Sequence, residues 1–159
     1  MKNMHWSVIL VALVLVGSFA VMSVSRSTTA FAAAPTTPNR PQPVEPDMHE
    51  FMEYVFQPTY KRLKLSIAGE PADNTGWKGI KADALILAEG GNLLMLRTPK
   101  EDAAAWNEIS AAVRASGASL YQSAKSKDYK SARQHYEVML KKCNACHDKF
   151  ADGEHQLSP

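Results

Sequence analysis

The sequence predicts an all-α protein, an antiparallel up-down-up-down four-helix bundle, and three observations lead to this prediction. Four segments between residues 47 and 150 repeat apolar residues at steps of three and four, the spacing that gives a helix one apolar face. Short segments containing Gly, Pro or Asp separate them, which favours antiparallel neighbours. No stretch shows the sustained alternation of apolar and polar residues that is typical of a strand.

Residues 1–34, which precede the predicted bundle, are interpreted as an export signal. Lys2 and His5 form a short basic start, residues 6–24 are almost unbroken apolar sequence, and residues 30–32 fit an A-x-A cleavage site. The apolar run exceeds the roughly 7–15 residues of a cleaved signal and is just long enough to cross a bilayer. A cleaved signal peptide and an N-terminal membrane anchor therefore both stay open. Either one delivers the remaining chain to the periplasm.

The charges of the remaining chain are balanced. Lys2 and Arg26 are the only basic residues before Ala33, and they belong to a total of 18 Lys and Arg. All 16 acidic residues come later, so the exported part has a net charge near zero. No strong basic field exists to attract nucleic acid.

Two irregular segments flank the predicted domain at 47–150. Residues 35–46 hold five prolines among Thr, Asn, Gln and Arg, which predicts an extended linker that either tethers the domain to a membrane or forms a mature N-terminus. Residues 151–159 are expected to be a C-terminal tail.

The first predicted helix covers residues 47–68 and the second 75–97. Pro58 predicts a kink or a restart within the first, and Gly69 with Pro71 ends it. The pair Gly90-Gly91 inside the second predicts close packing or a bend. The predicted inward residues are Met48, Phe51, Met52, Val55, Tyr60, Leu63 and Ile67 in the first, and Trp77, Ile80, Ala84, Leu87, Gly91 and Leu94 in the second.

The third predicted helix begins at Thr98 and ends near Lys125, and the fourth follows Asp128 as its N-cap. Thr98 with Pro99 and Glu101 resembles a capping box with proline at the first helical position. The predicted inward residues are Trp106, Ile109, Val113, Ser116 and Leu120 in the third, and Ala132, Tyr136, Met139, Cys143, Cys146 and Phe150 in the fourth.

The sequence contains only two cysteines, and they form the motif Cys143-Asn144-Ala145-Cys146-His147. A disulfide across so short a loop would constrain little of the unfolded chain. A thioredoxin-like redox pair requires a βαβ context, and a zinc site requires further ligands at suitable spacing. The sequence shows neither the βαβ context nor the additional ligands. C-x-x-C-H is the attachment signature of haem c, in which each thiol adds across one vinyl group and the adjacent histidine ligates the iron. We therefore expect one covalent haem, held by Cys143, Cys146 and His147.

The position of this motif in the last of four helices resembles the class II c-type cytochromes, which include cytochrome c′ and its low-spin relatives. The resemblance covers residues 47–150, and His147-Asp148-Lys149-Phe150 matches the family's H-x-x-F or H-x-x-Y continuation. It implies a proximal ligand at His147 and places Phe150 near the proximal side, although packing in the core explains that aromatic equally well. The family commonly has Arg or Lys after the aromatic residue, where this chain has Ala151, so its proximal electrostatics are expected to differ.

The resemblance implies that the first helix supplies the residue on the other side of the iron. Alignment on the helix proline selects Met52, whereas alignment on Gly69-Glu70 selects Phe56; Met48 is a third candidate. A methionine ligand would make a six-coordinate electron carrier, and Phe56 would leave an open or plugged five-coordinate site for NO or CO. Each of these side chains could equally be ordinary core.

The function expected first is electron transfer with a redox partner protein, and the alternative is a gas carrier, scavenger or sensor. An enzyme is not expected, because no distal His/Arg pair is recognisable. Lys141, Lys142 and Lys149 flank the motif and could pair with haem propionates or an acidic partner, but a solvated helix face explains them more simply. Relatives of this fold often pair through the first two helices, so a homodimer is a further expectation.

Overall fold

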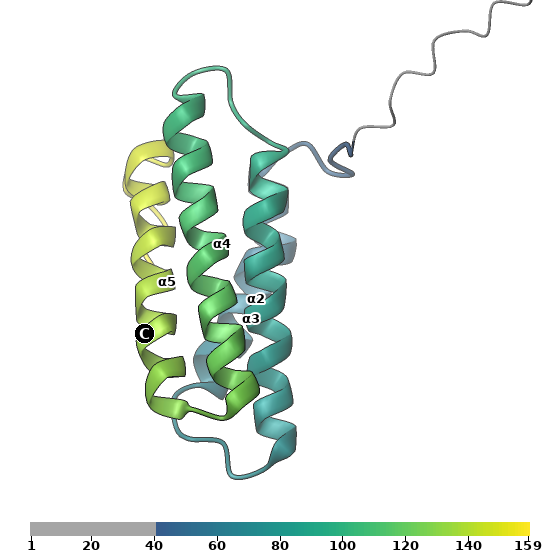
Figure 1. Ribbon diagram of the computed structural model, residues 1–159. Helices are drawn as coiled ribbons and strands as arrows, with labels where there is room; N and C mark the ends of the chain where they lie inside the picture. The colour runs from purple at the N-terminus through teal and green to yellow at the C-terminus, as the bar shows by residue number, and fades with distance from the viewer. Residues whose placement is uncertain (1–40) are drawn as a thin grey trace, which may run out of the picture. The chain divides into compact units, whose positions relative to one another are not determined.

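The computed structural model describes residues 41–159, and it is an all-α four-helix bundle (Figure 1). The predicted export segment 1–34 and the first half of the predicted linker lie outside the described residues. The helices follow one another along the chain and pack as sequential antiparallel neighbours, as the sequence predicts. None of the helices after residue 40 is both long and apolar enough to span a membrane.

The first helix of the bundle consists of three continuous pieces: α1 (Met48–Phe51), the π-helical turn η1 (Met52–Phe56) and α2 (Gln57–Ser66). Asp47 caps its start by accepting a hydrogen bond from Glu50 N–H at 2.9 Å. Pro58 lies in the first turn of α2. It has no N–H to donate to the preceding turn, and its ring would clash with the carbonyl of that turn in a regular α-helix. The preceding turn widens instead, and Gln57 N–H bonds to the Met52 carbonyl five residues earlier. The predicted interruption at Pro58 is therefore a π-turn.

The second helix, α3 (Asn74–Met95), begins at Asp73, whose carboxylate accepts a hydrogen bond from Gly76 N–H at 2.9 Å. The Gly90-Gly91 pair within it serves close packing. A Cβ on Gly90 would lie 2.6 Å from the Phe56 ring, and one on Gly91 would lie 2.8 Å from the backbone of Arg114. Glycine is the only residue that leaves room for both neighbours at these distances.

The third helix, α4 (Ala103–Ser126), begins later than the sequence predicts. The expected capping box at Thr98 is not formed, because Asp102 adopts a left-handed backbone conformation (φ 53°) and the helix begins directly after it. The Thr98 hydroxyl instead lies 2.8 Å from the Met95 carbonyl and 2.8 Å from the Asn107 side-chain oxygen. It thereby joins the end of α3 to α4 across the connecting loop.

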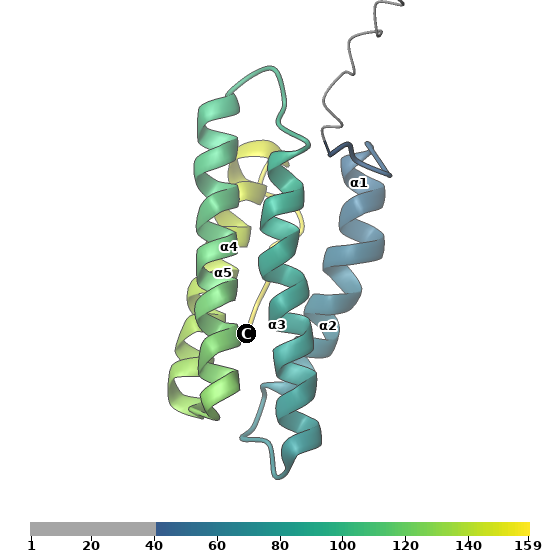
Figure 2. The same cartoon turned by 45° about the vertical axis from the view of Figure 1, so that its right-hand side comes forward.

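The fourth helix, α5 (Tyr129–Phe150), has the predicted N-cap, since Asp128 accepts a hydrogen bond from Ser131 N–H at 3.0 Å. The chain then reverses over residues 151–155, and the tail runs back along the bundle, as the yellow end of the ribbon in Figures 1 and 2 shows. Asp152, Gly153 and His155 all have positive φ angles in this reversal.

The predicted inward stripes of α3, α4 and α5 are confirmed, and most of their residues are buried. Among the described helices, the first has its close backbone contacts with α3 alone, and none with α5. A hydrogen bond links the first helix and α5 at one end, where the Tyr129 hydroxyl donates to the Ile67 carbonyl at 3.1 Å. Towards the other end a cleft separates them.

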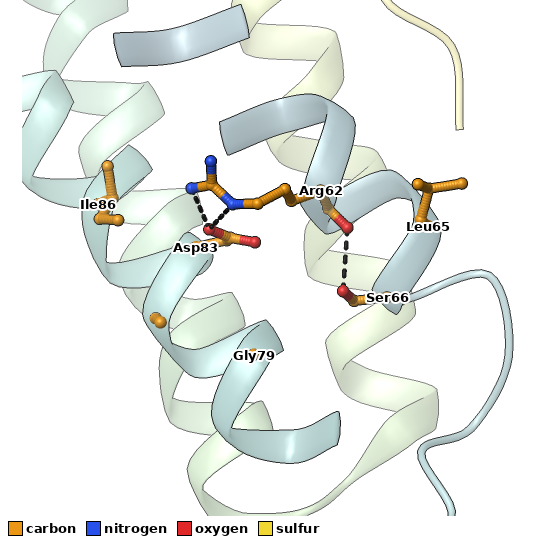
Figure 3. Close-up of a pocket in the computed structure, with 7 residues that line it drawn as sticks. Arg62, Leu65, Ser66, Gly79, Asp83 and Ile86 are labelled. Carbon is orange, nitrogen blue, oxygen red and sulfur yellow. Dashed lines mark hydrogen bonds and ion pairs between the residues drawn. The ribbon is translucent and has the colours of Figure 1, made fainter. Parts of the chain in front are cut away.

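The opposite side of the first helix packs on α3 through an ion pair (Figure 3). Arg62 donates to the same oxygen of Asp83 through Nη2 at 2.6 Å and through Nε at 3.1 Å. The Asp83 side chain is buried while Arg62 is half-exposed, so the guanidinium both neutralises the carboxylate and shields it from water. Leu65, Gly79 and Ile86 surround the pair in a shallow depression that contains none of the predicted site residues.

Candidate functional site

The cleft between the first helix and α5 brings together all six residues that the sequence singled out for a cofactor. Its volume is about 530 Å³, within the range of about 300–1,000 Å³ that is common for ligand sites. The predicted residues that line it are Met52, Phe56, Cys143, Cys146, His147 and Phe150, and the third distal candidate, Met48, lines it as well.

The cysteines project from one face of α5, because residues three apart lie on neighbouring turns. Cys146 is buried against Phe51, Leu94 and Trp106, whereas Cys143 is partly exposed to the cleft and packs on the main core. No disulfide joins them. Burial raises the pKa of both thiols, and that of Cys143 to about 12, to which the neighbouring Cys146 contributes. Both thiols are therefore neutral near pH 7.

His147 follows at the edge of the same cleft and is half-buried. Its Nδ1 lies 2.9 Å from the backbone carbonyl oxygen of His155 in the tail. A carbonyl oxygen can only accept, so Nδ1 must carry a proton and donate it. Loss of solvation on burial lowers the pKa of His147, although the bond to His155 raises it in part. The neutral ring then presents the lone pair of Nε2, the form in which imidazole ligates a metal.

The walls of the cleft are mostly apolar. Opposite the cysteine motif, Met48, Met52 and Phe56 come from the first helix, and the π-turn includes both Met52 and Phe56. The structure places all three distal candidates in one cleft and therefore leaves the choice among them open. The floor is formed by Leu87 and Leu94 of α3, Trp106 and Val113 of α4, and Met139 and Leu140 of α5.

Phe150 packs edge-on against Trp106, with ring centroids 5.0 Å apart at an interplanar angle of 78°. The Trp106 indole N–H in turn donates to the Leu94 carbonyl at 2.9 Å. Lys149, one of the lysines that flank the motif, pairs with Asp102 at 2.9 Å. This pair ties the end of α5 to the start of α4, so Lys149 already has a partner within the chain.

The residues present fit a haem, judged by the chemistry of the donor set. Two neutral thiols, an imidazole with a free Nε2 and an apolar cavity meet in one cleft. A thioether requires a thiol, iron requires an imidazole lone pair, and a flat macrocycle requires apolar walls. Nowhere in residues 41–159 do three His, Cys, Asp or Glu side chains gather in an arrangement that could hold a metal ion by themselves.

Sequence reasoning missed the tail as part of the site. His155, Gln156 and Leu157 line the cleft, and Leu157 packs against the main core. The segment has no helical or strand periodicity that would place it. Its one local signal is Asp152-Gly153, a dipeptide typical of turns, which could have predicted a reversal of the chain.

Comparison with protein-family models, with curated proteins and with solved structures found no match for this chain.

Proposed function

We propose that this protein is an exported monohaem c-type cytochrome that acts in electron transfer. In this proposal the haem is attached through thioethers to Cys143 and Cys146, with His147 as the proximal iron ligand. The observation that carries it is that two thiols and one imidazole of a single C-x-x-C-H motif open into one apolar cleft. The cofactor would supply a reversible one-electron couple at its iron.

The residues of the chain would do three things for such a cofactor. The thiols hold it by bonds that do not dissociate. Because its Nδ1 is engaged by the His155 carbonyl, His147 offers a single nitrogen in a single orientation. The apolar side chains, Leu87, Leu94 and Val113 among them, exclude water from the buried face, which disfavours the more highly charged oxidation state.

Covalent attachment is tested by the colour of the denatured protein. The chain is co-expressed with a haem c maturation system, purified, unfolded and extracted with acid-acetone. The proposal predicts that the haem absorption stays with the polypeptide, and that Cys143→Ala with Cys146→Ala abolishes this retention. Extraction of all colour into the solvent from the wild-type chain would refute attachment.

A second candidate function is binding of a small gas at a five-coordinate iron, and the position of Phe56 favours it. The Phe56 ring lies in the cleft, against Gly90 on one side and edge-on to Phe51 at 5.5 Å on another. A ring held in this way could cover the open side of the iron in place of a ligand. A high-spin spectrum that changes on addition of CO would support this function, and a low-spin spectrum insensitive to CO would support electron transfer.

The export signal, the periplasmic location, a redox partner and a homodimer belong to the same proposal. Their support is the sequence pattern of residues 1–34 and the family resemblance alone. Mass spectrometry of the protein purified from the periplasmic or membrane fraction would show whether the chain begins after residue 32 or retains its first segment.

A further inference from the structure

We infer that the tail segment Glu154–Ser158 is a positioning strap for His147, and that Asn144 and Tyr60 hold this strap in place from the two sides of the cleft. The inference rests on the proposed function, because it concerns the residue proposed as the iron ligand. It adds a role for the first variable position of the C-x-x-C-H motif, Asn144, and for residues that the motif does not include: Tyr60 and the strap itself.

The contact that matters is the one between His147 Nδ1 and the His155 carbonyl, at 2.9 Å. An imidazole in water prefers to carry its proton on Nε2, which would block the nitrogen that faces a metal. The carbonyl oxygen has no proton to give, so this bond exists only when the proton is on Nδ1. The strap therefore selects one tautomer and one ring orientation of His147, as partners of ligating histidines do in metal sites.

Asn144 fixes the strap from the α5 side. Its side-chain oxygen accepts from Leu157 N–H at 2.8 Å, and its side-chain nitrogen donates to the Leu157 carbonyl at 3.0 Å. One amide group thus satisfies both backbone polar groups of a single residue, in the way that a neighbouring strand would. The Leu157 side chain at the same time packs against the main core.

Tyr60 fixes the strap from the side of the first helix. Its hydroxyl donates to the Ser158 carbonyl at 2.7 Å and accepts from Ser158 N–H at 3.2 Å. Lys64, one turn along the same helix, reaches the Ser158 hydroxyl at 2.9 Å. The strap therefore bridges the two walls of the cleft, which make no close backbone contact with each other.

The backbone of the strap is bent in a way that needs such anchors. His155 has a φ angle of +58°, in the left-handed region that residues other than glycine rarely occupy. A conformation of this kind persists when its surroundings determine it, and it is common at functional sites. Here it occurs at the residue whose carbonyl meets His147, between the turn at Asp152-Gly153 and the anchored Leu157.

The test is the tautomer of His147, read from imidazole ¹⁵N chemical shifts in the full-length haem-free chain. The wild type should show the Nδ1–H tautomer. Asn144→Ala, Tyr60→Phe and a chain that ends at Gly153 should each convert most of the signal to the Nε2–H form. Tyr60→Phe is the more decisive variant, because it removes only one oxygen atom. That atom belongs to another helix and lies 83 residues before the cysteine motif, so the variant leaves the motif itself unchanged.

Two control variants separate the strap from general effects. Asn92→Ala removes an exposed amide network with Glu89 and Arg114, away from the tail, and should leave the tautomer unchanged. His155→Asn keeps the backbone carbonyl and suits a positive φ, so the Nδ1–H tautomer should persist without the second imidazole. Loss of the tautomer in His155→Asn would assign the effect to the His155 ring and overturn the inference.

The outcome is independent of whether haem binds. An Nε2–H tautomer in the wild-type haem-free chain would refute the strap even if the denatured holoprotein kept its colour. An Nδ1–H tautomer that responds to Tyr60→Phe would support the strap even if the haem were lost into acid-acetone. In the haem-loaded protein, the same variants should accelerate exchange of the His147 Nδ1 proton with solvent by at least about tenfold, the ratio expected for loss of a hydrogen bond worth about 1.4 kcal/mol.

Discussion

The Phe56 ring packs directly onto the α-carbon of Gly90, so closely that a Cβ at this position would lie 2.6 Å from the tip of the ring. Gly90→Ala should therefore push the Phe56 ring into the cleft, and this displacement should offset much of the roughly 1 kcal/mol by which alanine otherwise stabilises a helix over glycine. Chemical denaturation measures this effect. Gly79→Ala on the same helix is the matched control, because its nearest obstacle is the Ser66 hydroxyl at 3.9 Å. It should raise stability by up to about 1 kcal/mol, and equal effects of the two variants would contradict the packing.

The buried hydroxyl of Tyr136 has no hydrogen-bond partner among the described residues, although the side chain is fully buried. Tyr136→Phe should therefore leave the free energy of unfolding unchanged or raise it by about 1 kcal/mol, since it removes a group that lost its water on folding. Tyr129→Phe provides the contrast. It deletes the bond to the Ile67 carbonyl and should lower stability by about 1 kcal/mol. A loss of stability in Tyr136→Phe would mean that the hydroxyl does have a partner.

The raised pKa of Cys143, about 12, predicts how the haem-free chain responds to alkali. In the unfolded chain a thiol loses its proton near pH 9, whereas in the folded protein this thiol keeps it. The contribution of this thiol to the free energy of unfolding is therefore fully present below pH 9. It is lost between pH 9 and 12, by at most about 1.4 kcal/mol per pH unit.

Denaturation at pH 8 and pH 10 measures this slope, with Cys143→Ala as the control. The variant should lose stability more gently than the wild type over the same interval. The haem-loaded protein should do so as well, because a thioether does not titrate. A slope in Cys143→Ala equal to that of the wild type would show that Cys143 is not the group responsible.

The distal ligand can be decided by a pair of variants within one π-turn. If Met52 ligates iron, Met52→Ala should convert a low-spin spectrum to a high-spin one and remove a sulfur-to-iron absorption band, whereas Phe56→Ala should leave the spectrum low-spin. If Phe56 covers an open site, Phe56→Ala should increase the rate of CO binding and Met52→Ala should have little effect. Met48→Ala tests the third candidate, and a low-spin spectrum that survives Met52→Ala rules Met52 out.

The helices and the cysteine wall of the cleft could be predicted from the sequence because periodicity determines both. Trp77, Ile80 and Leu87 recur at steps set by the helical repeat, and Cys143 and Cys146 continue the same kind of repeat in α5. The predicted start of α4 at Thr98 is wrong, because whether a capping signal is used depends on the geometry of the loop before the helix. The left-handed conformation of Asp102 decides that geometry, and a single sequence does not reveal it.

The strap and the π-turn lay beyond sequence reasoning for a different physical reason. Pro58 predicts that a helix cannot continue unchanged, but a kink, a restart and a widened turn all satisfy it. The tail finds its place through Asn144 and Tyr60, which lie 13 and 98 residues from their partners. Contacts over such separations follow from the tertiary fold and leave no local pattern.

The cleft also has a consequence for cooperativity. The backbone of the first helix lies close to α3 over η1 and α2 but is close to α5 nowhere, so whatever fills the cleft becomes part of the core between the first helix and α5. A covalently attached occupant cannot be diluted away, and its contribution is therefore independent of concentration, unlike that of a dissociable ligand. Without an occupant, residues 48–56 should be the first segment to open in native-state hydrogen exchange, well before α3 and α4. If the chain is exported and carries haem as we propose, a first helix that closes last would leave both thiols accessible until the haem is attached.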